Sequence, residues 1–198
     1  MPTITLNKKV FDALVGKKLP LEKLKDRISM LGTDLEEVND KEIIVEVFPN
    51  RPDMLSVQGF ARAFSSFIGA KTGLRHYNVE HSKEKMIVEK SVAEVRPYTA
   101  CAIVKNLHFD DEKIKEVIDI QEKLHITYGR NRKKVAIGIY PFEKIKTPIR
   151  FMAQNPEEIF FQPLGFPRKI NALQILKQHP AGKEYGHLLE GKKKFPVF

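Results

Sequence analysis

The sequence contains a single cysteine, Cys101, and no tryptophan. One cysteine excludes both an internal disulfide and a cysteine-based zinc site. No apolar run approaches the roughly 20 residues of a membrane-spanning helix, and the first residues lack the apolar centre of a secretory signal. These absences predict a cytoplasmic protein with no membrane association. Cys101 lies in an apolar stretch and is predicted to be a small core residue.

Acidic residues are scarce in one part of the chain. The 198 residues carry a formal net charge of +9. Residues 1–85 hold 14 Lys and Arg against 12 Asp and Glu, whereas residues 86–198 hold 20 against 13. The positive excess of the second half favours an anionic partner there, and nucleic acid is the commonest one. A surface that is basic only for solubility is the alternative.

The basic charge is most concentrated between residues 123 and 140, a stretch without Asp or Glu. Its pattern is typical of a helix end, a turn marked by Gly129, and an apolar strand from Val135 to Tyr140. Its cations are Lys123, Arg130, Arg132, Lys133 and Lys134. Such a turn can bind phosphate, although a solvated basic surface is an equally good interpretation of these residues alone.

The side chains of this stretch differ in what they can bind. Arg130 and Arg132 can each grip a phosphate through two donors, while lysines act as point charges. Thr127 and Asn131 add neutral donors, and the ring of Tyr128 can stack on a base.

The first half of the chain carries clear local signals for strands and helices. Asn7 is expected to cap a helix that stops at Gly16, and Pro20 to open a second that ends at Gly32. The acidic stretch from Asp34 to Asp40 is predicted to be a loop. The expected elements are a strand up to Leu6, helices over 8–15 and 20–31, a strand over 42–48 and a helix over 56–68.

Residues 50–62 carry a specific motif. They read Asn-Arg-Pro-Asp-Met-Leu-Ser-Val-Gln-Gly-Phe-Ala-Arg. Taken alone, the Asn-Arg-Pro-Asp turn is a tight structural corner. The whole motif resembles the first module of the phenylalanine–tRNA ligase β subunit. The resemblance implies a small α+β unit related to nucleic-acid-binding folds, with a structural role for Arg51.

The second half is expected to form a separate module. Residues 69–85 are polar, with Gly69, Gly73, Asn78, Ser82 and scattered Lys, and are typical of a linker. The predicted division is therefore 1–85 and 86–198. The fold class is α+β, with a small N-terminal α+β module followed by a mixed β-sheet module with flanking helices. The strands expected there cover residues 86–89, 99–105, 135–140, 149–152 and 159–163, and the helices follow Asp110 and Asn171.

The second half extends the resemblance. Residues 123–125, 129–132 and 136–138 look like the opening of the β subunit's editing module in the archaeal or eukaryotic style, and residues 161–166 and 179–189 look like later parts. One departure is Pro141, which follows Tyr140 where relatives commonly carry Asp. In addition, the family's subunit is much longer, so the editing module is expected to continue past Phe198.

The resemblance implies a contribution to aminoacylation of tRNA(Phe) and to hydrolysis of mischarged tyrosyl-tRNA(Phe). A pocket built for phenylalanine rejects a molecule with one added hydroxyl only weakly, so a second site must read that hydroxyl. Hydrolysis of the ester needs a positioned water and stabilisation of an oxyanion. The implied partner is the α subunit, in a heterotetramer of two α and two β chains. That partner would hold ATP and Mg²⁺, and no cofactor is located in this segment.

Five residues are the candidates for the site. Lys123, Arg130, Asn131 and Arg132 are assigned to binding of the tRNA 3′ end, and His125 is the catalytic candidate that would orient the attacking water. A histidine beside a helix end is more often a packed or capping residue, and that interpretation stays open for His125.

Other chemistry has less support in the sequence. There is no Gly-x-Ser-x-Gly elbow and no partnered cysteine nucleophile, so no covalent intermediate is expected. His179 and His187 are too far apart for a paired metal site, and no metal is assigned. The alternative function is a non-catalytic RNA-binding and scaffolding arm of the same complex. The sequence does not identify which residue would read the tyrosine hydroxyl.

Overall fold

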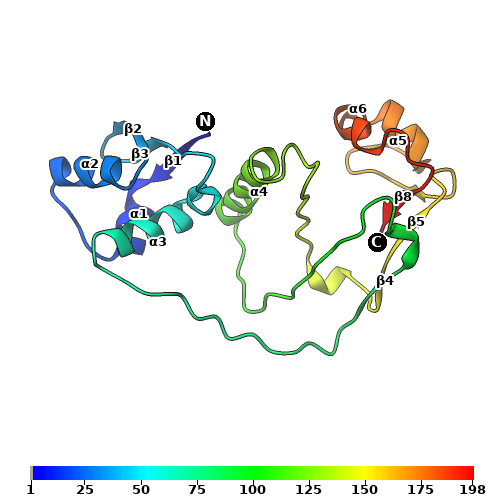
Figure 1. Cartoon of the computed structure of the whole chain (residues 1–198), viewed down its shortest axis with the longest axis horizontal. Helices are drawn as coiled ribbons and strands as arrows, with labels where there is room; N and C mark the ends of the chain where they lie inside the picture. The colour runs from blue at the N-terminus through cyan, green and yellow to red at the C-terminus, as the bar shows by residue number, and fades with distance from the viewer. Residues whose placement is uncertain (1) are drawn as a thin grey trace. The chain divides into compact units, whose positions relative to one another are not determined.

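The computed structural model describes residues 2–198, which divide into two compact units (Figure 1). The first unit runs to Asn78 and also contains Leu107–Gly138, and the second comprises Val79–Asn106 and Ile139–Phe198. Both combine helices with small sheets, which confirms the α+β class. Among the described residues, no helix has the length and apolar character needed to span a membrane.

The first unit is built around a three-stranded antiparallel sheet in the order β1-β3-β2. Its strands are β1 (Thr3–Asn7), β2 (Asp34–Val38) and β3 (Glu42–Glu46), and its helices are α1 (Lys8–Val15), α2 (Leu21–Met30), the 3-10 turn η1 (Pro52–Met54), α3 (Val57–Phe67) and α4 (Asp111–Ile126). Ile4 pairs with Val45, and Leu6 with Ile43. These four side chains are buried in one cluster with the apolar faces of α1, α2 and α3.

Local signals place the helices of this unit as predicted. The Asn7 side chain accepts a hydrogen bond from the Val10 N–H, and α1 ends at Gly16 with φ of +73°. Ser56 accepts from the Gly59 N–H at 3.0 Å and so caps α3. Each cap satisfies a backbone donor that the first turn of a helix leaves without a partner.

One prediction in this unit is wrong. The acidic stretch expected as a loop begins with strand β2, which pairs with β3 and contains an irregularity between Leu35 and Glu37. Leu35 and Val38 pack against the core, while the acidic side chains face outward. A strand with only one buried face can therefore be mostly acidic.

The Asn-Arg-Pro-Asp corner is held by an ion pair within the motif. Arg51 donates to both carboxylate oxygens of Asp53, at 3.0 and 2.9 Å. The hydrogen bonds from Arg51 lower the pKa of Asp53. Gly59 is required next to this corner, because a Cβ there would lie 2.0 Å from the carbonyl oxygen of Asp53. The arginine therefore has the structural role that the resemblance implied.

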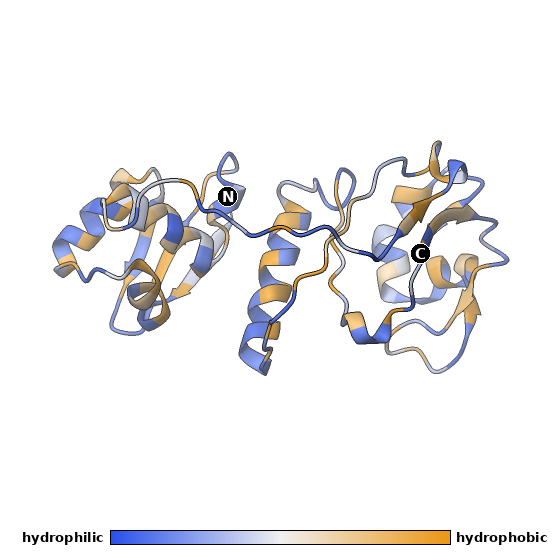
Figure 2. Cartoon of the chain, turned by 90° about the horizontal axis from the view of Figure 1, so that it is seen from below, coloured by the Kyte–Doolittle hydropathy of each residue, from blue (hydrophilic) through white to orange (hydrophobic). Residues whose placement is uncertain are grey.

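Helix α4 groups with the first unit. Leu124 packs against the unit's core, and Gln58 of α3 donates a hydrogen bond to Glu116 at 2.8 Å. Hydrophobic and hydrophilic bands alternate along the helix (Figure 2). The predicted division at residue 85 had put this helix in the second module. The compact units and the predicted domains therefore differ over residues 79–85 and 107–138.

The second unit contains two small sheets. One has the order β4-β5-β8, with β4 parallel and β8 antiparallel to β5, and the other pairs β6 with β7. The elements are β4 (Met86–Val88), η2 (Lys90–Val92), η3 (Phe142–Lys144), β5 (Ile149–Gln154), β6 (Phe160–Phe161), β7 (Ile170–Asn171), α5 (Ala172–Gln178), α6 (Pro180–Tyr185), η4 (Gly186–Leu189) and β8 (Phe195–Val197). Asn171 and Gln174 form a reciprocal capping box at the start of α5. Asn171 thus caps α5, the helix that the sequence predicts to follow it.

Two predicted strands are absent. Residues 99–105 and 135–140 are apolar and rich in β-branched side chains, yet neither range pairs with another strand of the described chain. Cys101 is exposed there and is not the core residue expected. Strand propensity reflects a fit to a pleated, half-buried surface, so an apolar sequence without such a neighbour does not become a strand.

Candidate nucleic-acid interface

The basic turn, defined here as residues 127–134, folds back over the C-terminus of α4. The last four residues of a helix leave their carbonyl groups without partners inside the helix. Here all four carbonyls, of residues 123–126, accept hydrogen bonds of 2.8–3.2 Å from backbone N–H groups of the turn. The donors are Thr127, Gly129, Asn131 and Arg132. The turn is therefore a tightly bonded cap on α4.

The backbone at the centre of the turn is in an unusual conformation. Arg130, Asn131 and Arg132 have φ values of +51°, +51° and +65°. The left-handed conformation costs an L-residue roughly 1–2 kcal/mol, and asparagine tolerates it best. Gly129 precedes them, and a Cβ there would lie 2.6 Å from the carbonyl oxygens of both His125 and Val135. The hydrogen bonds to α4 hold this strained backbone in place.

His125 fastens the segment that follows the turn. Its side chain is buried, with 3% of its surface exposed, and its Nε2 accepts a hydrogen bond from the Ile137 N–H at 2.7 Å. The proton of a neutral ring then lies on Nδ1, which faces Glu122 Oε1 at 3.3 Å. Gln121, one turn before His125, donates to the Ile137 carbonyl at 2.7 Å. Two side chains of α4 thus hold both backbone groups of one residue.

Glu122 ties the turn to α4 through charge. Arg132 lies 2.6 Å from both carboxylate oxygens of Glu122. Burial acts to raise the pKa of Glu122, but the hydrogen bonds and charge of Arg132 outweigh it, and the pKa lies below its usual value. This pair corrects the expectation of a turn without a local counterion. The counterion is on α4, because Glu122 lies ten residues before Arg132 in the sequence.

The remaining cations divide into held and outward-facing groups. Lys123 forms an ion pair with Asp119 on the preceding turn of α4. The Lys134 ammonium lies 4.4 Å from the centre of the Tyr128 ring, a cation–π contact. Arg130 and Lys133 are exposed, and within residues 2–198 neither lies in an ion pair. Arg130 and Lys133, together with the exposed amide of Asn131, are therefore accessible to a phosphate group in solution.

The structure therefore brings the five predicted residues together but gives them different surroundings. Arg130 and Asn131 point outward, Lys123 and Arg132 are ion-paired, and His125 is enclosed. Sequence reasoning did not select Gln121 and Glu122. The helical spacing i, i+4 puts Gln121 and His125 on one face, and this spacing was the available signal.

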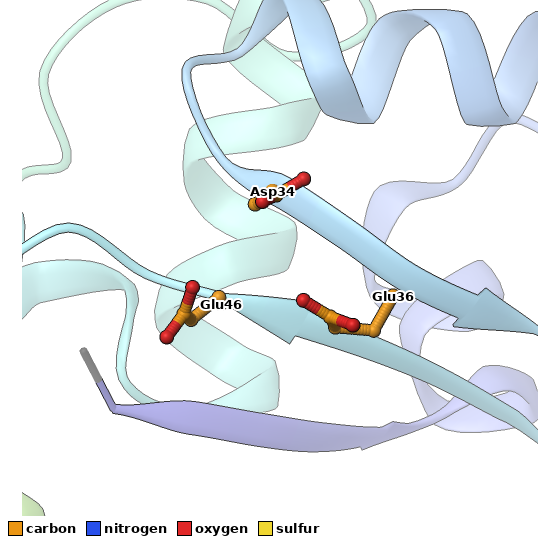
Figure 3. A group of neighbouring side chains, drawn as sticks. All are labelled: Asp34, Glu36 and Glu46. Atoms are coloured by element: carbon orange, nitrogen blue, oxygen red, sulfur yellow. The ribbon is translucent and has the colours of Figure 1, made fainter.

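The other candidates have structural partners or lack a site. His179 accepts from the Ala181 N–H at the start of α6 and contacts the Leu164 carbonyl at 3.1 Å, and His187 contacts the Glu184 carbonyl at 3.0 Å. Lys192 donates to the backbone carbonyl of Glu94. The first unit also carries a surface group of three carboxylates within 4.8 Å of one another, Asp34, Glu36 and Glu46 (Figure 3). Exposed acidic groups of this kind are common without an ion.

Comparison with known proteins gives a consistent result along the whole chain. No model of a protein family matches it. The chain is 41% identical over 197 residues to the phenylalanine–tRNA ligase β subunit of Archaeoglobus fulgidus, and 39% identical over 197 residues to that of Methanosarcina barkeri. Each alignment covers 100% of this chain and 36% of the relative.

A solved structure agrees with these relatives. The crystal structure of an N-terminal fragment of the phenylalanyl-tRNA synthetase β-subunit from Pyrococcus horikoshii matches 98% of this chain with a TM-score of 0.87 and 34% sequence identity. The match covers 57% of that fragment. The chain therefore belongs to the β-subunit family of phenylalanine–tRNA ligase, and it spans about a third of the length of the curated relatives it matches.

Proposed function

We propose that this chain is a tRNA-binding part of a phenylalanine–tRNA ligase β subunit, which contributes to aminoacylation of tRNA(Phe) and to hydrolysis of tyrosyl-tRNA(Phe). Identity over the full chain with β subunits of that name supports the assignment. The proposed partners are the α subunit, in a complex of two α and two β chains, and tRNA(Phe). The proposed location is the cytoplasm.

The observation that carries the RNA-binding part is the basic turn. Arg130 and Lys133 are exposed cations on a backbone that is fixed to α4 by four hydrogen bonds. Because this backbone is already ordered, binding of phosphate has to order only the two side chains and not the main chain. Arg130 can take two phosphate oxygens at once, and Asn131 beside it adds a neutral donor.

The other candidates act in this proposal by holding the turn and its surroundings. Arg132 is paired with Glu122 and so holds the turn against α4, whereas Lys123 is paired with Asp119 within α4. His125 is a positioning residue, because both ring nitrogens already have partners and the side chain is buried. Loss of His125 would therefore weaken tRNA binding through the turn.

Hydrolysis of the tyrosyl ester is the part of the proposal that depends on the whole subunit. The sequence carries no motif of an activated nucleophile, so in this proposal water attacks the ester carbonyl while donors stabilise the oxyanion. Neither the enclosed His125 nor Pro141, at the position where the resemblance implies an Asp, supplies an exposed base. ATP and Mg²⁺ are assigned in this proposal to the α subunit, as the resemblance to the ligase family implies, and no cofactor is placed on this chain.

The enclosed position of His125 favours a second candidate function for this segment by itself. A non-catalytic RNA-binding and scaffolding arm needs the exposed cations but no base. The two candidates differ in whether the 198-residue chain releases tyrosine from tyrosyl-tRNA(Phe).

Binding and hydrolysis can be measured on the same samples. The probes are tRNA(Phe), tyrosyl-tRNA(Phe) and, as the hydrolysis control, phenylalanyl-tRNA(Phe). The variant is Arg130→Ala with Lys133→Ala, and the matched control is Lys193→Ala with Lys194→Ala, two exposed lysines of the second unit. We expect the first pair to weaken tRNA binding about tenfold and the control pair to have less than a twofold effect.

The outcomes separate the two functions. Selective release of tyrosine, lost with the Arg130 and Lys133 pair, supports an editing role for this chain. Binding without hydrolysis supports the scaffolding arm. Equal loss of binding in both variant pairs contradicts a role for the basic turn, because the attraction would then follow net charge alone.

A further inference from the structure

The first unit contains an open groove of about 800 Å³ that the basic turn only partly forms. Most of its lining comes from three segments: η1 and the start of α3, the extended chain around Tyr77, and the last turns of α4 with residues 128–137. Leu14 of α1 and Lys71 complete it. Tyr128 belongs both to the groove and to the basic turn. The groove therefore continues directly from the proposed phosphate-binding surface.

The floor of the groove is apolar. It is formed by aliphatic side chains from α1, α4 and the segment after the turn, namely Leu14, Ile120, Leu124, Val135 and Ile137. His125 and Gln121 fix part of this floor, because both hold the backbone of Ile137. Covering an apolar floor with a weakly hydrated group removes apolar surface from water, which favours binding.

The sides of the groove carry positive charge. Arg62 of α3 and Arg75 are exposed, and no carboxylate of residues 2–198 lies in an ion pair with either. Lys71 is engaged with the carbonyl of Leu14 at 3.3 Å. The acid that lines the groove, Asp53, is already paired with Arg51 through two hydrogen bonds. The charge of Arg62 also acts on Asp53, but neither Arg62 nor Arg75 is held in an ion pair among residues 2–198, so both can attract an anion.

Two aromatic rings stand at the groove with large exposed surfaces. Tyr77 is 73% exposed and Tyr128 is 52% exposed. Lys134 lies over the Tyr128 ring and adds positive charge beside it. Rings that alternate with cations along an open groove are the arrangement by which proteins bind unpaired nucleotides, since every base has a face that can stack.

We propose that this groove binds unpaired nucleotides of an RNA, with bases stacked on Tyr77 and Tyr128 over the apolar floor and phosphates facing Arg62 and Arg75. The proposal rests on the proposed function and deepens it, because it assigns to the first unit a site for a single-stranded part of the tRNA. An acidic peptide would use the arginines but would leave both rings uncovered. A duplex would hide the faces of its bases.

The test uses the full chain and a labelled oligouridine of eight nucleotides, with a blunt RNA duplex of equal length for comparison. Fluorescence anisotropy gives Kd at two salt concentrations. Tyr77→Ala is expected to raise Kd for the single strand about tenfold, whereas Tyr77→Phe, which keeps the ring, changes it less than twofold. Arg62→Ala with Arg75→Ala is expected to raise it at least tenfold and to flatten its salt dependence.

The failure of this proposal can be distinguished from failure of the proposed function. If Arg130→Ala with Lys133→Ala weakens tRNA(Phe) binding while the Tyr77 and Arg62 variants bind the single strand as wild type does, the groove proposal is overturned and the basic turn survives. If no variant changes binding of either RNA, both are overturned. Tighter binding of the duplex, or equal competition by an octaglutamate peptide, also overturns the groove proposal.

Discussion

Among residues 2–198, the first unit buries fifteen hydrophobic side chains in one cluster, whereas the second unit divides its clustered core into two groups of three. The first core joins a sheet to three helices, and Phe11 packs against both Phe60 and Phe64 with ring centres 6.1 and 5.3 Å apart. In the second unit, Phe151 stacks on Phe198, a ring that is 73% exposed. The difference indicates that the first unit, which includes α4 and the basic turn, is more firmly packed than the second.

The largest expected effect comes from the centre of the first core. Phe60→Ala removes a fully buried ring and should lower the free energy of unfolding by about 3–5 kcal/mol, because the lost burial and the cavity both count. Phe198→Ala in the second unit should cost about 1 kcal/mol or less, since most of the ring already meets water. Urea unfolding followed by circular dichroism measures both. Similar losses of unfolding free energy in Phe60→Ala and Phe198→Ala would contradict the difference in core packing between the two units.

A second prediction concerns the corner that carries the motif. Gly59→Ala puts a Cβ against the carbonyl oxygen of Asp53 and should lower the free energy of unfolding by about 1–3 kcal/mol. Gly73→Ala is the control for added bulk, since nothing lies within 4 Å of a Cβ there, although its φ of +87° carries its own strain. Crystallography or NMR shifts around Asp53 would show the displaced corner. An unchanged corner with unchanged stability would contradict the close approach.

The third prediction tests the hydrogen bond by which His125 of α4 holds the segment after the basic turn. His125→Ala leaves the Ile137 N–H without its acceptor and should lower local stability by about 1–3 kcal/mol. The expected readout is faster hydrogen exchange at the Ile137 amide with little change in the core amides of β3. Lys115→Ala, an exposed position on the same helix, is the control. Exchange at Ile137 that is unchanged in His125→Ala would mean that His125 does not position this segment.

The smallest effect is pH-dependent. The folded-state pKa of Glu122 is below its usual value, so its contribution to stability is present above about pH 4.5 and is lost as the pH falls through the lowered pKa. Glu122→Gln should therefore be less stable than wild type at pH 7 by about 1 kcal/mol or less, because solvent screens this half-exposed pair. The difference should shrink as the pH falls below about 4.5. A difference that grows on acidification would contradict the assigned sign.

The elements that the sequence predicts well are those with a local cause. Asn7 and Ser56 cap helices, Pro20 precedes one, and alternation marks β3, so no distant contact is needed to recognise them. The strands expected at 99–105 and 135–140 failed for the opposite reason. Their side chains suit a sheet, but a strand also needs a neighbour, and no local signal supplies one.

In the candidate site too, features with a local cause are predictable from the sequence, whereas features that depend on distant contacts are not. The sequence predicts where the cations lie, and the structure keeps them together on one turn. Their pairing was not predictable from a count of nearby charges. Glu122 lies ten residues before Arg132 in the sequence, and the two side chains come together only because the backbone between them adopts a left-handed conformation. The enclosure of His125 depends on Ile137 folding back along α4, which no short-range pattern encodes.

The central claim is that Arg130 and Lys133 on the basic turn contact RNA phosphates. The most direct test is the salt dependence of tRNA(Phe) affinity for the wild-type chain and for Arg130→Ala with Lys133→Ala. We predict that the slope of log K against log salt concentration falls by about 1.4–1.8 in the variant, since each lost phosphate contact removes roughly 0.7–0.9. Equal slopes for the wild-type chain and the variant would contradict the claim, because the two cations would then make no contact with phosphate in the complex.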